Sequence, residues 1–210
     1  MVRKYEGFLV TFESTCEGIG KTTQALKLVE NLNEANVESL YTKEPYTPQF
    51  RAILKGKEMN LSPSAELFLM NADRAQHFHE VIEPALIAGK VVVCDRYFDS
   101  TLAYQGYGLG WDRGTLEALH YISTGFTLPD ITFVFDGEPF RQRDEDDRFE
   151  ARDDAYFERV RKGMLELSKP HPQGWVSRYR LIQANRQIEE IAKHVLNQTL
   201  MHINMMKTLR

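Results

Sequence analysis

Residues 17–23 read EGIGKTT, a run whose residue types suit the phosphates of a nucleoside triphosphate. In a phosphate-binding loop, consecutive backbone N–H groups point at the phosphates, and the helix that follows adds a partial positive charge. Gly18 and Gly20 leave room for close approach. Lys21 can reach the β- and γ-phosphates, and the Thr22 hydroxyl can bind Mg²⁺. The run therefore predicts a phosphate-binding loop (P-loop).

The entrance to this loop departs from the P-loop pattern G-x-x-x-x-G-K-[ST]. Counting back from Lys21, the first glycine of the pattern falls at Thr15. This position lies at the turn out of the preceding strand, so the change affects how the chain enters the loop more than how the loop touches phosphate. We expect the cradle to be intact from Glu17 to Thr23. A glycine-rich turn into a helix, without a ligand, is the structural alternative.

A second candidate site ends the apolar run VVVCDRY at 91–97. A buried strand that ends in Asp95 places a carboxylate at the carboxyl edge of the sheet, where ligands of open α/β folds bind. Asp95 could hold Mg²⁺ directly or through water, or it could cap a helix. Arg96 beside it could bind an acceptor phosphate.

The segment FRQRDEDDRFEARDD at 140–154 is highly charged, with four arginines among seven acidic residues. A solvated loop or helix start is the simpler interpretation. The arginines could instead supply positive charge over a phosphate.

Short apolar runs alternate with amphipathic helical patterns along the chain. The runs predict five strands, at 7–12, 37–42, 91–95, 131–136 and 179–184. The patterns predict helices at 22–35, 62–86, 113–123, 153–168 and 187–197, with Ser62 as a possible N-cap. Alternation of this kind predicts an α/β fold with a parallel sheet between helices. The tail at 201–210 shows no clear pattern.

Composition adds broad limits. The 210 residues are 42% hydrophobic and 27% charged, with a net charge of −4 that offers no basic footprint for nucleic acid. Cys16 and Cys94 lack metal-ligand spacing and are expected to be reduced thiols. The start MVRKYEG has no apolar signal core, and no apolar run reaches the roughly 20 residues of a membrane span. We therefore expect one cytoplasmic domain over 1–210.

Three motifs together resemble the thymidylate kinase family. They are CDRYFDSTLAYQGYGLG at 94–110, NADRAQH at 71–77 and DRFE at 147–150, and the likeness runs from about residue 8 to residue 197. The resemblance implies a P-loop kinase fold, with a five-stranded parallel sheet flanked by helices and a short mobile lid within about 138–152. It also implies Mg²⁺-dependent transfer of the γ-phosphoryl of ATP onto dTMP, which gives dTDP.

The resemblance assigns three sets of site residues. The ATP set comprises Thr15, Cys16, Glu17, Gly18, Ile19, Gly20, Lys21, Thr22, Thr23 and Arg141. The dTMP set comprises Arg51, Met70, Arg74, Arg96, Thr101, Tyr104 and Gln105. The residues implied to act in phosphoryl transfer are Lys21, Glu17, Arg96, Arg143 and Arg148.

Individual roles follow the same resemblance. Mg²⁺ is expected near Thr22 and Asp95, and Glu17 near the metal and the sugar 3′-hydroxyl. Arg51 and Arg96 match the arginines on the acceptor phosphate. Tyr104 matches the ring that crowds the 2′ position of the sugar, and Thr101 matches a polar contact to the base edge. Arg74 and Gln105 are expected to hydrogen-bond to the carbonyl edge of the pyrimidine.

The chain also departs from the family pattern. Ile19 stands where some members carry arginine, so positive charge should come from the lid, as in bacterial-type members. The stretch before DRFE is short, which leaves open whether Arg141 or Arg143 reaches the phosphates. Met70 replaces a stacking phenylalanine, so the base pocket should be softer and dUMP should also be accepted. Residues 13–15 read Glu-Ser-Thr in place of Glu-Gly.

Other classes of protein remain alternatives. A deoxynucleoside kinase shares the sheet and the P-loop but takes an unphosphorylated acceptor. A catalytically silent P-loop module would bind nucleotide without turnover. A GTP-binding switch would need an N-K-x-D stretch, which the sequence lacks. By resemblance alone, the helix at 62–86 is expected to form a homodimer.

Overall fold

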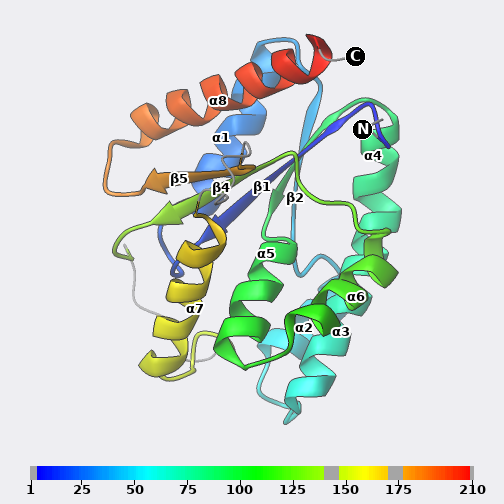
Figure 1. Cartoon of the computed structure of the whole chain (residues 1–210), viewed down its shortest axis with the longest axis vertical. Helices are drawn as coiled ribbons and strands as arrows, with labels where there is room; N and C mark the ends of the chain where they lie inside the picture. The colour runs from blue at the N-terminus through cyan, green and yellow to red at the C-terminus, as the bar shows by residue number, and fades with distance from the viewer. Residues whose placement is uncertain (1–3, 140–146, 170–176, 209–210) are drawn as a thin grey trace.

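The computed structural model describes residues 4–139, 147–169 and 177–208. Within them, five parallel strands form one sheet in the order β2-β3-β1-β4-β5 (Figure 1). The strands are β1 (Phe8–Ser14), β2 (Ser39–Lys43), β3 (Val91–Asp95), β4 (Ile131–Asp136) and β5 (Tyr179–Gln183). The order is typical of an open α/β sheet with crossover helices on both faces.

Strand register brings the carboxyl ends of the strands to one edge. Asp95 on β3 is opposite Phe12 of β1 and Lys43 of β2. Asp136 ends β4 opposite Gln183 of β5. Polar residues from segments far apart in sequence therefore meet at this edge, where ligands of such sheets bind.

Helices cover both faces of the sheet. They are α1 (Lys21–Glu34), α2 (Pro48–Lys55), α3 (Pro63–His77), η1 (Phe78–Ile82), α4 (Glu83–Ile87), α5 (Phe98–Thr101), η2 (Leu102–Gly108), α6 (Arg113–Thr124), α7 (Asp154–Leu167) and α8 (Ile188–Thr208), where η1 and η2 are π-helical. Helices α1 and α8 lie together on one face, and α3, α5 and α6 lie on the other (Figure 1).

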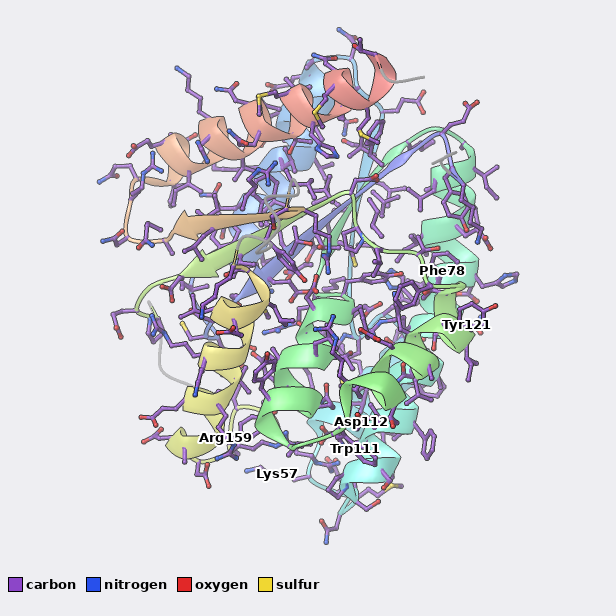
Figure 2. The ribbon with its side chains drawn as sticks, in the orientation of Figure 1. Lys57, Phe78, Trp111, Asp112, Tyr121 and Arg159 are labelled. Carbon is purple, nitrogen blue, oxygen red and sulfur yellow. The ribbon has the colours of Figure 1, made fainter. Side chains whose placement is uncertain are left out.

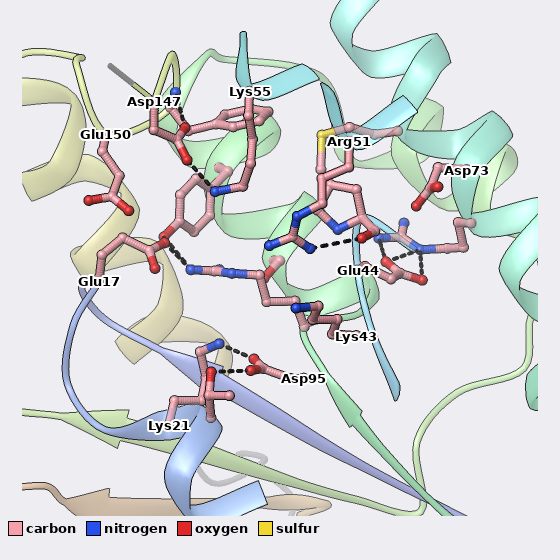
Figure 3. A pocket seen from close by; sticks show the side chains of 18 of the residues that line it. Glu17, Lys21, Lys43, Glu44, Arg51, Lys55, Asp73, Asp95, Asp147 and Glu150 are labelled. Atoms are coloured by element: carbon pink, nitrogen blue, oxygen red, sulfur yellow. Dashed lines mark hydrogen bonds and ion pairs between the residues drawn. The ribbon is translucent and has the colours of Figure 1, made fainter. Parts of the chain in front are cut away.

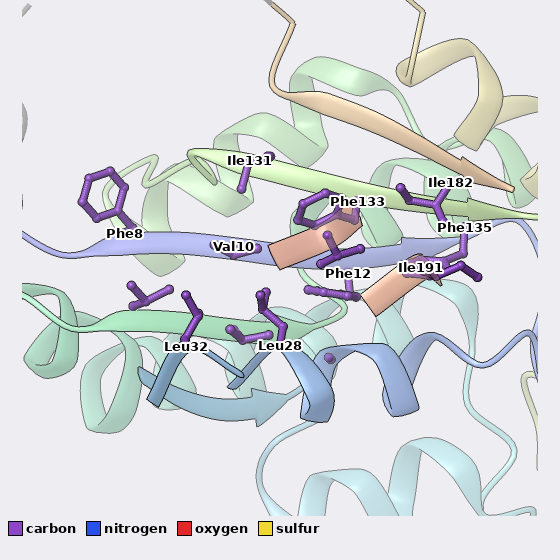
Figure 4. Close-up of a cluster of buried hydrophobic side chains, with 14 of the residues drawn as sticks. Phe8, Val10, Phe12, Leu28, Leu32, Ile131, Phe133, Phe135, Ile182 and Ile191 are labelled. Atoms are coloured by element: carbon purple, nitrogen blue, oxygen red, sulfur yellow. The ribbon is translucent and has the colours of Figure 1, made fainter. Parts of the chain in front are cut away.

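Aromatic and aliphatic side chains fill the layer between the sheet and the pair of helices α1 and α8 (Figure 4). The ring of Phe12 lies 5.4 Å from that of Phe133 and 5.6 Å from that of Phe135. Leu28 of α1 and Ile191 of α8 close the layer from the helical side. Burial of these side chains holds the strand ends in a fixed frame.

All five predicted strands are confirmed within one to two residues. The predicted helix 62–86 is α3, η1 and α4 in succession, and the Ser62 side chain caps it by accepting the Ala65 N–H at 3.2 Å. Helix α8 continues to Thr208, so most of the tail without a pattern is helical. The prediction missed α2 and the helical stretch from α5 through η2.

The cysteines and the helices of the described ranges bear on two of the predictions made from composition. Neither Cys16 nor Cys94 is in a disulfide, in agreement with the prediction of free thiols. No helix among the residues described has the length and apolar character of a membrane span.

Candidate active site

A cavity of about 240 Å³ opens at the carboxyl edge of the sheet (Figure 3). The predicted site residues that line it are Glu17, Lys21, Thr22, Arg51, Met70, Arg74, Asp95, Arg96, Tyr104 and Gln105. The P-loop end of the predicted site and its acceptor end therefore share one cavity.

The loop between β1 and α1 has the backbone that a P-loop needs. Gly18 and Gly20 have φ angles of 67° and 85°, a region that residues with a Cβ rarely adopt. Lys21 begins α1, is 7% exposed, and pairs with one oxygen of Asp95, while the Thr22 hydroxyl donates to the other (Figure 3). Burial alone would raise the pKa of Asp95, but Lys21 and Thr22 outweigh it and lower that pKa. Asp95 is thus an anion beside the phosphate loop.

Thr22 and Asp95 form a donor set that suits Mg²⁺. Both offer oxygen atoms, and Mg²⁺ in phosphoryl-transfer sites takes one or two protein oxygens together with phosphate oxygens and water. No group of three or more His, Cys, Asp or Glu side chains among the described residues could hold a metal by itself. The residues fit an ion that is shared with bound phosphates.

The loop entrance at Thr15 is held by hydrogen bonds to β4. Its backbone N–H donates to the Phe135 carbonyl at 2.9 Å, and its hydroxyl donates to Asp136 at 2.8 Å. Thr15 is 2% exposed and has no positive φ angle. Both of its donors are therefore directed to β4, which gives Thr15 a supporting role at the entrance, and its contact with ATP stays a prediction. The next residue, Cys16, likewise turns its thiol toward the Gly137 carbonyl at 3.5 Å.

Replacing Thr15 with glycine should therefore destabilise the protein and leave nucleotide binding almost unchanged. The variant loses a buried hydrogen bond and gains chain entropy in the unfolded state, together worth about 1–2 kcal/mol. Urea denaturation measures the loss, and Thr15→Ser is the matched control because it keeps the hydroxyl. A glycine variant as stable as the wild type would contradict the supporting role.

Glu13, near the end of β1, supports the segment that carries Arg96. Its carboxylate accepts the N–H groups of Tyr97 (2.9 Å) and Ser100 (3.3 Å) and the hydroxyl of Ser100 (2.6 Å). Burial and the nearby Asp99 raise the pKa of Glu13 to about 7. Glu13 does not line the cavity, so it orders the segment that carries Arg96 from outside the cavity.

Arg96 lines the cavity and has a strained backbone conformation. Its φ angle is 72°, which is rare for a residue with a side chain and is often found at functional sites. The guanidinium pairs with Glu17 and lies 5.0 Å from the ring centre of Tyr104, whose hydroxyl donates to Glu17 at 2.8 Å. Burial would raise the pKa of Glu17, but Arg96 and Lys21 outweigh it and lower that pKa to about 2.

Arg74 is buried deep in the cavity and is held from three sides. It forms a two-pronged ion pair with Glu44 and donates to the Tyr97 carbonyl (3.1 Å) and the Thr101 hydroxyl (2.9 Å). These contacts among the described residues leave one of its five N–H groups for a ligand. Thr101 does not line the cavity and contacts Arg74, and its contact with the base stays a prediction.

Gln105 is fully buried and lines the same cavity as Arg74. Its amide nitrogen donates to Glu66 at 3.0 Å, while its oxygen Oε1 is buried without a partner among the described residues. The group of Gln105 that is left for a ligand is therefore an acceptor, whereas the expected bond to a pyrimidine carbonyl needs a donor.

The lid residues are only partly described. Arg141 and Arg143 lie outside the described residues. Arg148 donates to the carbonyls of Gly56 and Met59 and does not line the cavity. These contacts join the Arg148 segment to the residues that follow α2, and the catalytic role of Arg148 stays a prediction.

Several lining residues were missed by the sequence analysis, among them Lys43, Glu44, Lys55 and Asp147. Lys43 and Glu44 follow the predicted strand 37–42. Their place at its carboxyl end is the one sequence signal that could have indicated them as site residues. Lys55 ends α2 and pairs with Asp147 across the cavity mouth (Figure 3). Because α2 was not predicted, no sequence signal pointed to Lys55.

An open parallel sheet with this loop between β1 and α1 defines a P-loop nucleotide-binding protein. The family model described as Thymidylate kinase matches residues 16–195. The chain is 38% identical to the thymidylate kinase of an Exiguobacterium species, over 92% of this chain and 94% of the relative. It is 40% identical to that of Cutibacterium acnes, over 90% and 94%.

A solved structure agrees with these relatives. The crystal structure of thymidylate kinase from Ehrlichia chaffeensis superposes with a TM-score of 0.73 at 32% identity, covering 92% of this chain and 98% of that one. The chain belongs to the thymidylate kinase family and is a nucleoside monophosphate kinase.

Proposed function

We propose that this enzyme transfers the γ-phosphoryl of ATP onto dTMP, giving dTDP, and that it also accepts dUMP. One observation carries the proposal. A single cavity is lined by the P-loop lysine, by Arg96, by the buried Arg74 and by Gln105, whose amide oxygen has no partner among the described residues. This arrangement suits an acceptor that already carries a phosphate and a pyrimidine with both a carbonyl and an N–H.

Phosphoryl transfer requires little covalent chemistry from the protein, so positioning and positive charge account for most of the catalysis. Lys21 lies at the start of α1, where it would contact the β- and γ-phosphates. Arg51 and Arg96 would bind the acceptor phosphate. Arg96 would then release Glu17, with which it is paired in this structure. Glu17 would then be free to accept a hydrogen bond from the sugar 3′-hydroxyl. Arg141 and Arg143 of the lid would add charge over the transferred group.

Mg²⁺ would be held by Thr22 and Asp95, and when bound it would neutralise charge on the donor phosphates. The present pairing of Lys21 with Asp95 keeps both side chains at the phosphate end before substrate enters.

The base end reads two adjacent positions of a pyrimidine. The remaining N–H of Arg74 would donate to the O4 carbonyl, and Oε1 of Gln105 would accept the N3–H. Thymine and uracil present both groups. Cytosine reverses both, because it carries an amino group at position 4 and a bare nitrogen at position 3.

The acceptor preference between dTMP and dUMP should be small. These bases differ by one methyl group, which an apolar pocket distinguishes by about 10–200-fold. Met70 lines the cavity and is flexible, so we expect a kcat/KM ratio near the lower limit. Met70→Phe is the matched variant and should raise the ratio. A preference for dTMP above about a thousandfold in the wild type would contradict the soft pocket.

We also propose a cytoplasmic homodimer. Large apolar side chains on the neighbouring helices α3 and α6 support the dimer, since Phe68, Tyr121 and Ile122 are 62%, 65% and 78% exposed. Tyr121 projects outward from α6 in Figure 2. Exposed apolar residues gathered in this way mark interaction surfaces.

A further inference from the structure

Glu66 is a buried carboxylate of α3 that stands behind the base end of the cavity. It is 2% exposed and does not line the cavity. One of its oxygens accepts the amide N–H of Gln105 at 3.0 Å, and the other accepts a guanidinium N–H of Arg152 at 2.5 Å. Glu66 therefore joins a residue at the cavity wall to Arg152, at the end of the expected lid segment.

The chemistry of Glu66 fixes which way the Gln105 amide faces. An ionised carboxylate has only acceptors, so the NH₂ of Gln105 must face Glu66. The amide oxygen then faces the opposite way, where it lies buried without a partner in the described structure. Turning the amide over would place oxygen against oxygen and leave the NH₂ without an acceptor on that side.

Arg152 is the cation that pairs with the Glu66 carboxylate. A buried carboxylate is costly without a paired cation, and Arg152 supplies one. Arg152 is itself held by Tyr156 of α7, because it donates to the tyrosine hydroxyl at 2.6 Å and its guanidinium lies 4.5 Å from the ring centre. It follows the cavity residue Glu150 by two positions, which places it at the lid base.

We propose that Glu66, held by Arg152, is a positioning residue that makes Gln105 a hydrogen-bond acceptor and thereby sets selection against cytosine. The inference rests on the proposed function, in which Gln105 reads position 3 of the base. A freely turning amide could serve either N3–H or bare N3, so Glu66 provides discrimination that Gln105 alone does not have.

The test is the ratio of kcat/KM for dTMP to that for dCMP in Glu66→Gln. This variant offers Gln105 either a donor or an acceptor, so the amide can turn. We expect the ratio to fall by about tenfold, the size of one buried hydrogen-bonding group, while KM for ATP stays unchanged. Arg74 would still favour dTMP. A merely structural role would lower both kcat/KM values together and leave the ratio unchanged.

Glu80→Gln is the matched control, because Glu80 also accepts a glutamine amide but is exposed and outside the cavity. Arg152→Lys should keep the ratio and Arg152→Met should lower it, which provides the test if Glu66→Gln does not fold. An unchanged ratio in Glu66→Gln, or an equal fall in Glu80→Gln, would overturn the inference. Failure of the proposed function is distinct, since it would show as a wild type without dTMP-dependent turnover.

Discussion

Replacing Lys21 with alanine is expected to lower kcat by about 10²–10³, the usual effect of removing one preorganised positive group from charge that develops in the transition state. Lys21 begins α1 directly after Gly20 and lies in the cavity beside Thr22. Its charge would therefore act on the phosphates themselves. Steady-state ADP release at saturating ATP and dTMP measures the effect.

The burial of Lys21 requires a control for folding. Its removal leaves Asp95 buried without its cation, and breaking such a pair costs about 3–5 kcal/mol. Turnover should therefore be reported per folded molecule, with the folded fraction taken from denaturation curves. Lys27→Ala is the matched control, because Lys27 lies on the same helix and pairs with Glu189 at the surface. Turnover of folded Lys21→Ala within threefold of the wild type would refute the assignment.

The second large effect concerns the base. We expect kcat/KM for dCMP to be at least about 10⁴-fold below that for dTMP, because sites built on buried hydrogen bonds reject a mismatched partner by this amount. Arg74 would face an amino group, and Oε1 of Gln105 would face a bare nitrogen. Two mismatched pairs at buried positions leave both protein groups without partners.

dUMP is the control for this comparison, since it keeps both hydrogen-bonding groups and lacks only the methyl. Efficient dUMP turnover with poor dCMP turnover would show that the hydrogen bonds to the base, and not the size of the base, cause the discrimination against dCMP. A dCMP value within about a hundredfold of dTMP would contradict the reading of the base by Arg74 and Gln105.

The sheet could be predicted from sequence because its strands are short apolar runs between helical patterns, as at 91–95 and 131–136. Helix α2 was missed because it has eight residues and only Leu54 is buried, so its apolar pattern is weak. The stretch from α5 through η2 was missed because its π-helical part does not follow the 3.6-residue period.

The phosphate end of the site could also be predicted, because each P-loop position has a local chemical reason. The roles behind the base could not. Thr101 meets Arg74 across 27 residues, and Glu66 meets Gln105 and Arg152 across 39 and 86 residues. Such pairings are fixed by the packing of α3, α5, η2 and the segment before α7, which no short motif encodes. The entrance at Thr15 likewise depends on β4, 121 residues further along the chain.

ADP release from the purified chain, with ATP, Mg²⁺ and either dTMP or thymidine, tests the central claim most directly. We expect release that depends on dTMP and saturates with it, and no release above background with thymidine, because Arg51 and Arg96 would bind the acceptor through its phosphate. Release with thymidine at a rate equal to that with dTMP would indicate a deoxynucleoside kinase. ATP binding without dTMP-dependent release would indicate a silent P-loop module, and either result would contradict the account.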